Sequence, residues 1–163
     1  MHIARADASD IDALTRVEIE SKRASIPEIL DPVQSDFANR KLRWETYFRG
    51  ESPVGSKPPR IVLKVILTRN VVGFVAGHLT TRYGMDAEIQ SFYVLREHQR
   101  NGIGSALLAE LANWLIQVSA YKLCVGIASE NPYRVFYSKH GAHYLNEHWM
   151  FWDDVHSLVA AEV

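Results

Sequence analysis

The stretch that most constrains the fold of this chain is AEIQSFYVLREHQRNGIGSALLAELANWL, residues 87–115. Its first eight residues are typical of a β-strand and its last dozen of an amphipathic helix, with the turn 99–104 between them. A glycine-bearing turn that opens a helix presents unpaired backbone N–H groups at the positive end of the helix dipole, and this arrangement binds phosphates. Gly102 and Gly104 allow a diphosphate to approach the backbone closely, because no Cβ stands in the way.

Two common phosphate-binding motifs do not fit this turn. A dinucleotide-binding fingerprint needs a third glycine where Leu107 stands, and an acidic residue about 20 positions further on. The string nearest to a P-loop, GESPVGSK at residues 50–57, has its last two residues in reversed order and is followed by two prolines. Both motifs are therefore excluded.

The turn resembles the Gln/Arg-x-x-Gly-x-Gly/Ala signature of the GNAT superfamily, the general-control-type N-acetyltransferases, through Gln99, Gly102 and Gly104. In that family the turn holds the pyrophosphate of acetyl-coenzyme A. A second stretch, NPYRVFYSKHG at residues 131–141, resembles the family's Asn-x-x-Ala/Arg-x-Phe-Tyr-x-x-x-Gly segment in a form one residue shorter. With two motifs in the right order, the chain is identified as a member of this family over about residues 2–153.

The resemblance implies which residues contact acetyl-CoA, mostly through their backbone. Asn131 would contact the pantetheine arm and Tyr137 would lie by the thioester sulfur, whereas Arg100 either adds a charge-assisted contact to phosphate or is simply solvated. The full implied set is Phe92, Tyr93, Val94, Gln99, Arg100, Asn101, Gly102, Ile103, Gly104, Ser105, Asn131 and Tyr137.

Tyr137 is the first of two candidate catalytic residues. When an amine attacks a thioester a thiolate must leave, and its pKa is about 8.5 against about 10 for a phenol. Tyr137 can therefore donate a hydrogen bond or a proton to the leaving sulfur. The alternative is that its ring only packs, with its hydroxyl bonded to backbone.

Glu88 is the second candidate, as the base that accepts the amine proton. Two-residue alternation places Glu88, Gln90, Phe92 and Val94 on one face of their strand, so we expect Glu88 on the cofactor-binding face. The alternative is an edge carboxylate or one paired with arginine. If this strand bulges as in the family, a main-chain N–H near Val94 is the expected oxyanion donor.

Two other residue types, histidine and cysteine, are candidates for chemistry. His78 and His148 are secondary candidates for the base, because both are expected at strand ends near the cleft. Cys124 lies in an expected buried strand and is interpreted as a small core residue, which favours direct transfer in a ternary complex over an acyl-cysteine route. No spacing of histidines indicates a metal site.

The aromatic residues of the variable segments are candidates for the acceptor pocket, although core packing explains them too. Their ring faces can receive an amine cation. They are Trp44, Tyr47, Tyr83, Trp149 and Trp152, and the aromatic string 149–152 can instead form a homodimer seam. The acceptor is expected to be an amine on a small molecule or a peptide. A non-catalytic acetyl-CoA-binding module is the alternative function.

Length, net charge and cysteine content limit the kind of protein that this chain can be. The 163 residues suit one domain, whose tail at 156–163 is expected to be either frayed or an edge helix. A net charge of −1 favours neither a nucleic-acid nor a membrane surface. The single cysteine excludes an intrachain disulfide and, with no apolar segment at the start, indicates a cytoplasmic protein.

The order of expected elements predicts a mixed α/β (α+β) fold with a partly antiparallel sheet flanked by helices. Strands are expected at 2–6, 61–67, 71–79, 87–94, 122–127, 142–145 and 148–153, and helices after Asp7 or Ser9, at about 33–48, after the turn, and at 131–140. The resemblance implies that the parallel strands 87–94 and 122–127 splay apart to hold acetyl-CoA.

Overall fold

The computed structural model describes residues 1–25, 36–50, 58–127 and 133–159. The strands are β1 (His2–Arg5), β2 (Arg60–Leu67), β3 (Asn70–Leu79), β4 (Ala87–Val94), β5 (Leu123–Gly126), β6 (His143–Asn146) and β7 (Trp149–Trp152). The helices are α1 (Ile11–Ser25), α2 (Phe37–Arg49), α3 (Ile103–Gln117), α4 (Tyr133–Lys139) and α5 (His156–Val159), with the short 3-10 turns η1 (Ala8–Asp10), η2 (Arg82–Gly84) and η3 (Arg96–His98).

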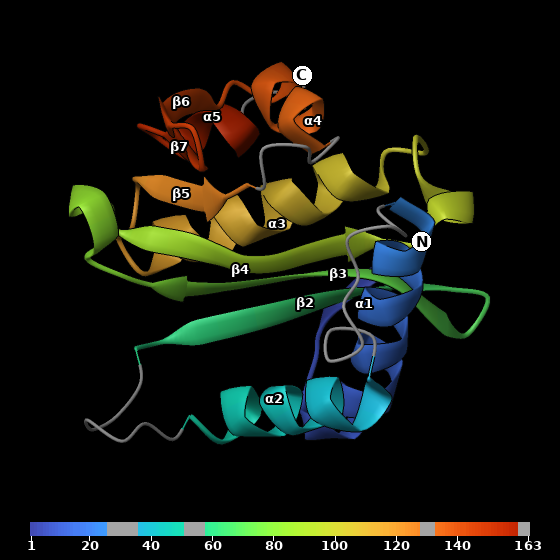
Figure 1. The fold of residues 1–163 in the computed structure, drawn as a ribbon. Helices are drawn as coiled ribbons and strands as arrows, with labels where there is room; N and C mark the ends of the chain where they lie inside the picture. The colour runs from blue at the N-terminus through green and yellow to red at the C-terminus, as the bar shows by residue number, and fades with distance from the viewer. Residues whose placement is uncertain (26–35, 51–57, 128–132, 160–163) are drawn as a thin grey trace.

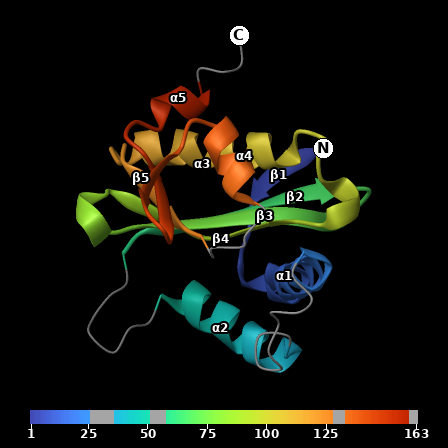
Figure 2. The same ribbon diagram turned by 45° about the horizontal axis from the view of Figure 1, so that its top comes forward.

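These elements form one mixed sheet between two layers of helices. The strand order is β1-β2-β3-β4-β5-β7-β6, and only the β4–β5 pair among the described strands is parallel. Helices α1 and α2 cover one face of the sheet, whereas α3, α4 and α5 lie on the other (Figures 1 and 2). The predicted fold class is therefore confirmed.

Local sequence explains where the elements begin and turn. The Asp7 carboxylate accepts from the Ser9 backbone N–H at 2.8 Å, so Asp7 is the cap of η1, which leads into α1. Asp36 caps α2 by accepting from two backbone N–H groups, so this helix begins after residue 36; the expected start at 33 lies outside the described residues. In the β2–β3 hairpin Thr68 and Arg69 both have positive φ, as a two-residue turn of the favoured hand requires.

Strand β4 contains the irregularity that organises the site. Its register against β3 matches Ser91 to Ala76 and Ile89 to Gly77, which leaves Gln90 as an extra residue, a β-bulge. The pairing of β4 with β5 covers only residues 87–89, so the two parallel strands part just where the bulge begins. The splayed pair implied by the resemblance is therefore present.

The apolar side of α3 packs on the sheet and closes the core on that face. Its buried residues include Leu107, Leu108, Leu111 and Leu115, which recur at helical spacing as an amphipathic helix requires. Trp44 of α2 is buried against Phe74 of β3 on the opposite face, with ring centroids 5.2 Å apart. Within the described residues, no helix has an apolar run of the length that crossing a bilayer requires.

Candidate active site

The turn before α3 opens onto a cleft of about 570 Å³ on the α3 side of the sheet. Gly102 is the helix N-cap with φ +80°, and the first intrahelical bond runs from the Ala106 N–H to its carbonyl at 3.0 Å. The amides of residues 103–105 therefore precede the helical ladder and face outward at its positive end. Arg100 also has a positive φ of 63° and its exposed side chain lines the same cleft.

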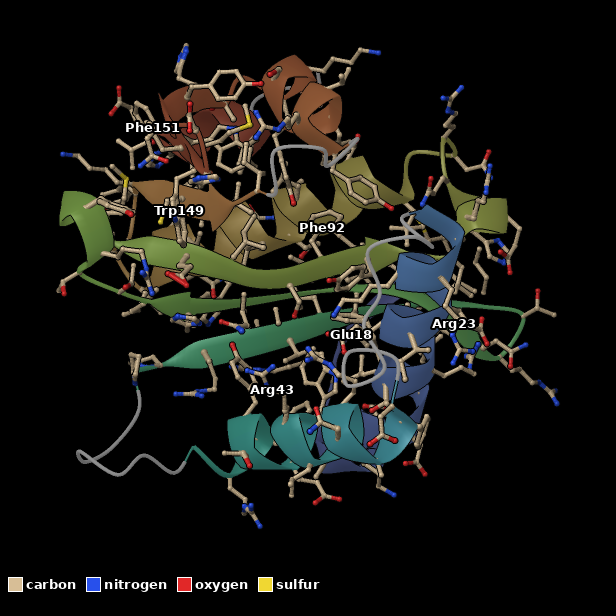
Figure 3. The ribbon with its side chains drawn as sticks, in the orientation of Figure 1. Glu18, Arg23, Arg43, Phe92, Trp149 and Phe151 are labelled. Atoms are coloured by element: carbon tan, nitrogen blue, oxygen red, sulfur yellow. The ribbon has the colours of Figure 1, made fainter. Side chains whose placement is uncertain are left out.

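The cleft is narrow at the second turn glycine. A Cβ on Gly104 would lie 3.1 Å from the ring of Phe136, an α4 residue that lines the cleft together with Phe92 of β4. Figure 3 shows the Phe92 side chain on the α3 side of β4. Any side chain at position 104 would fill the space between the turn and these rings. The cradle suits an extended group with a diphosphate, whose oxygens accept from backbone N–H groups.

Two side-chain networks hold the walls of the cleft together. The Gln99 amide nitrogen donates to the Val94 carbonyl and to the Tyr133 hydroxyl, both at 2.9 Å, so it joins the turn to β4 and α4. The Nδ1 of His140 lies 2.8 Å from the Phe136 carbonyl, which makes Nδ1 the protonated nitrogen. Its Nε2 then accepts from the Ser105 hydroxyl at 2.8 Å.

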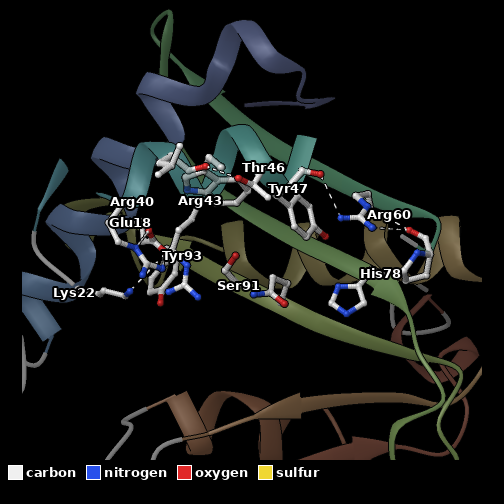
Figure 4. Close-up of a pocket in the computed structure, with 14 residues that line it drawn as sticks. Glu18, Lys22, Arg40, Arg43, Thr46, Tyr47, Arg60, His78, Ser91 and Tyr93 are labelled. Atoms are coloured by element: carbon white, nitrogen blue, oxygen red, sulfur yellow. Dashed lines mark hydrogen bonds and ion pairs between the residues drawn. The ribbon is translucent and has the colours of Figure 1, made fainter. Parts of the chain in front are cut away.

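A second cavity, of about 570 Å³, lies on the opposite face of β4 under α1 and α2 (Figure 4). Trp44 and Tyr47, two of the aromatic residues predicted to line an acceptor pocket, do line it, and the Tyr47 hydroxyl donates to the Gly77 carbonyl at 3.3 Å. From the sheet come His78 on β3 and residues 90, 91 and 93 on β4. Two cavities on opposite faces of β4 therefore adjoin the point where β4 leaves β5.

The bulge corrects the prediction for Glu88. Its register partner is His78, whereas Phe92 pairs with Val75 on the other face, so the extra residue Gln90 breaks the alternation. Glu88 and Gln90 consequently face the α1–α2 side, not the face of Phe92 and Val94.

Near Val94, where the main-chain donor is expected, β4 has already parted from β5. The register of β4 with β3 is regular from residue 91 to 94, and the N–H of Leu95 donates to the Val72 carbonyl at 2.9 Å. Because the Leu95 N–H faces β3, the Val94 N–H faces the edge that β5 has left, so the structure is compatible with a main-chain donor near Val94 as well as at the Gln90 bulge.

Glu88 is buried and already has partners. Its Oε2 accepts from the Arg82 Nε at 2.8 Å, and its Oε1 lies 3.7 Å from the Nε2 of His78. His78 lines the second cavity and the carboxylate lies behind it. His148, the other candidate histidine, is exposed at the β6–β7 turn and lines neither cavity.

Comparison with known proteins agrees with this geometry. The model of the acetyltransferase (GNAT) family matches residues 23–142. The chain belongs to this family of acetyltransferases. It is 28% identical over 141 residues, 83% of this chain and 76% of the other, to the uncharacterized N-acetyltransferase YuaI of Bacillus subtilis (strain 168).

Solved GNAT structures share the fold. The PaiA N-acetyltransferase from Thermoplasma acidophilum, solved in complex with coenzyme A, superposes with a TM-score of 0.71 at 18% identity, covering 92% of this chain and 96% of that one. YncA, a putative acetyltransferase from Salmonella typhimurium solved with acetyl-CoA, gives 0.64 at 20% identity, covering 93% and 92%. The predicted family and fold of this GNAT protein are thus confirmed.

Tyr137 lies in α4 with only 5% of its surface exposed. Its ring packs edge-on against Phe92 at 6.4 Å and against Trp152 at 5.8 Å between centroids. Burial, with a smaller contribution from Tyr133, raises the pKa of the Tyr137 phenol well above its ordinary range. No hydrogen bond joins its hydroxyl to another described residue, so the backbone bond of the alternative interpretation is not present there.

The remaining candidates fall outside the two cavities. Trp152 is a core residue, and its indole N–H donates to the His140 carbonyl at 2.9 Å, so the prediction that it lines an acceptor pocket is wrong. Tyr83 packs on Trp149 at 5.5 Å away from both linings. Asn131 lies outside the described residues.

The buried cysteine of this GNAT protein, Cys124, has an unreactive thiol. Burial, with the Glu88 carboxylate adding to it, raises the pKa of the Cys124 thiol to about 12. A thiol in that state is a poor nucleophile, as expected for a core residue. Among the described residues no group of His, Cys, Asp and Glu has a metal-binding arrangement.

Sequence analysis missed the charged end of the second cavity. It is lined by Glu18 and Lys22 of α1 and by Arg40 and Arg43 of α2. In an amphipathic helix, charged residues are expected on the face that points to solvent. Sequence analysis also missed Tyr133 and His140 in the first cleft. No sequence signal identifies these residues, because each is brought into place by packing between segments far apart in the chain.

Proposed function

We propose that this protein transfers an acetyl group from acetyl-CoA to an amine, with the two substrates bound on opposite faces of β4. The observation that carries the proposal is the bulge at Gln90 coupled to the parting of β4 from β5 after Ile89. In the proposed reaction the acetyl group and the amine meet at this gap, where β4 is no longer paired with β5.

The residues of the first cleft suit the cosubstrate. The backbone amides of 103–105 would hold its diphosphate, with the Arg100 guanidinium beside them, and Phe92 and Phe136 would line its arm. When bound, acetyl-CoA supplies an activated acetyl group and a thiol leaving group. Backbone N–H groups released at the bulge are the donors we assign to the developing oxyanion.

On the other face, the amine must lose a proton before it attacks. His78 borders the cavity and Glu88 lies behind it, so we assign proton acceptance to this pair, with Glu88 orienting the imidazole and stabilising its charged form. Burial raises the pKa of Tyr137 above its ordinary range, so its phenol is protonated at neutral pH and can donate to the departing sulfur. The buried thiol of Cys124 supports direct attack in a ternary complex.

Steady-state thiol release with acetyl-CoA and an amine panel tests the proposal. Tyr137→Phe removes only the hydroxyl, so we expect kcat to fall about tenfold or more while the free energy of unfolding changes little. Tyr144→Phe, at an exposed tyrosine, is the control and should behave as wild type. Coenzyme A binding with no turnover on any amine would instead support a non-catalytic acetyl-CoA-binding module.

A further inference from the structure

The second cavity carries a surplus of positive charge at the end formed by α1 and α2. The described lining residues include four basic side chains, Lys22, Arg40, Arg43 and Arg60, against a single acid, Glu18. Figure 4 shows Lys22, Arg40, Arg43 and Glu18 gathered around Tyr93, with His78 and Arg60 at the far end. The overall charge of the chain is −1, so this surplus is local.

The acid at this end is already satisfied. Arg40 donates from Nε and Nη2 to the two Glu18 oxygens, both at 3.0 Å, a bidentate pair in which Arg40 is 14% exposed and Glu18 4%. The Lys22 ammonium is 3.6 Å from one of the same oxygens, and 16% of its side chain is exposed. The single Glu18 carboxylate is therefore shared by two half-buried cations, Arg40 and Lys22.

Arg43 adds a third cation to the same end. It comes from α2 and points toward the sheet (Figures 3 and 4), and no hydrogen bond or ion pair joins its guanidinium to another described residue. Arg43 is exposed, whereas Lys22 and Arg40 beside it are largely buried. Like charges gathered in one concave site repel one another, and a bound anion would balance them. A cavity of about 570 Å³ is the size that small-molecule ligands occupy.

We propose that the acceptor is a small amine that also carries an anionic group, a carboxylate or a phosphate, bound by Lys22 and Arg43. This inference rests on the proposed acetyl transfer for the role of the amine. Tyr93 lies two residues from Ser91 at the bulge, which is roughly 7 Å along a strand. An anion beside Tyr93 therefore leaves an amine several bonds away near Ser91 at the bulge, between the cationic end and His78.

Two matched pairs of amines test the charge requirement. The first pair is γ-aminobutyrate and γ-aminobutyramide, and the second is phosphoethanolamine and ethanolamine, so carboxylate and phosphate are distinguished. We expect the anionic member of at least one pair to have a kcat/KM about tenfold or more above its neutral partner. Arg43→Gln and Lys22→Gln should abolish this preference by raising KM for the anionic amine alone.

The control variant is Lys41→Gln, on the same helix as Arg43 but paired with the exposed Asp12 outside the cavity. It should keep the preference. All three variants should bind coenzyme A as wild type does, because the cleft for the cosubstrate lies on the other face of β4. Equal turnover of charged and neutral amines would overturn the anion site and leave acetyl transfer intact.

A binding experiment decides the inference even if no amine turns over. Butyrate and butyramide lack the amine, and their binding can be followed by tryptophan fluorescence, since Trp44 lines the cavity. Butyrate should bind about tenfold more tightly than butyramide to the wild type and equally weakly to Arg43→Gln. Absence of any preference in the wild type, for butyrate and for inorganic phosphate alike, would refute the anion site whatever the enzyme assay shows.

Discussion

The two faces of β4 are built in different ways. On the α3 face, the proposed phosphate-binding wall is formed by one continuous stretch, residues 99–105, and its chemistry would lie in backbone amides and in the absence of side chains. On the α1–α2 face, the cavity takes residues from α1, α2, β2, β3 and β4, and its chemistry lies in charged and aromatic side chains.

This difference has a physical consequence for specificity. A diphosphate is the same in every acyl-CoA, so a wall of backbone N–H groups can bind it with little dependence on neighbouring side chains. An acceptor is distinguished by its own charge and shape, and only side chains supply such contacts. Substitutions in the first wall should therefore change affinity for the cosubstrate, whereas substitutions in the second should change the choice of amine.

The largest effect is expected from Gly104→Val, which tests the backbone wall. The new side chain would meet the Phe136 ring, since a Cβ alone would lie 3.1 Å from it. We expect the Kd for coenzyme A, measured by calorimetry, to rise roughly a hundredfold, or about 3 kcal/mol.

Glu110→Val is the matched control for this substitution, because it places the same residue on the exposed side of α3. It should leave coenzyme A affinity unchanged. If Gly104→Val bound coenzyme A as tightly as wild type, the turn before α3 would not be the phosphate site, and the contrast between the two faces would fail.

An effect of similar size, on kcat and not on binding, is expected from the pair on the other face. Glu88→Gln and His78→Asn should each lower kcat by about a hundredfold, which is within the usual contribution of a general base. If the two act as one unit, the double variant should be no worse than either single variant. The affinity for coenzyme A should not change.

His148→Gln provides the control, since that histidine is exposed and lines neither cavity. Multiplicative losses in the double variant would mean that Glu88 and His78 act separately, and undiminished activity in both single variants would remove the proton-accepting role from this face.

The smallest expected effect is on the stability of the protein at alkaline pH, and it involves a buried tyrosine on each face of β4. Burial raises the pKa of Tyr93 on the acceptor face and of Tyr137 on the cofactor face. The unfolded chain loses these phenol protons near pH 10, before the folded protein does. Their contribution to stability is therefore complete below about pH 10 and is lost as the pH rises toward the higher folded values.

Thermal unfolding measured from about pH 8 to about pH 11 checks this expectation. Tyr93→Phe and Tyr137→Phe should each make the fall in Tm less steep, and Tyr144→Phe, at an exposed position, should not alter it. A slope unchanged by all three variants would indicate that the two phenols titrate normally.

Much of the cofactor side was predictable from sequence because its signals are local. The strand 87–94, the turn with Gly102 and Gly104, and the following helix appear as expected, since hydrophobic period and glycine conformation act over a few residues. The splayed strands were implied by the family resemblance. The face of the strand on which Glu88 lies was predicted wrongly, because a bulge inserts one residue into the alternation. Nothing in the sequence around Gln90 indicates that bulge.

By itself, the sequence determined the family, the sheet, the glycine turn that opens α3 and the burial of Cys124. Only the tertiary structure decided that Glu88 pairs with Arg82 behind His78, and that Trp152 belongs to the core. It also decided that the cations of α1 and α2 converge on one cavity, a pattern that no linear spacing contains. The reason is physical: local backbone preferences are encoded in neighbouring residues, whereas the meeting of side chains from separate segments depends on how whole layers pack.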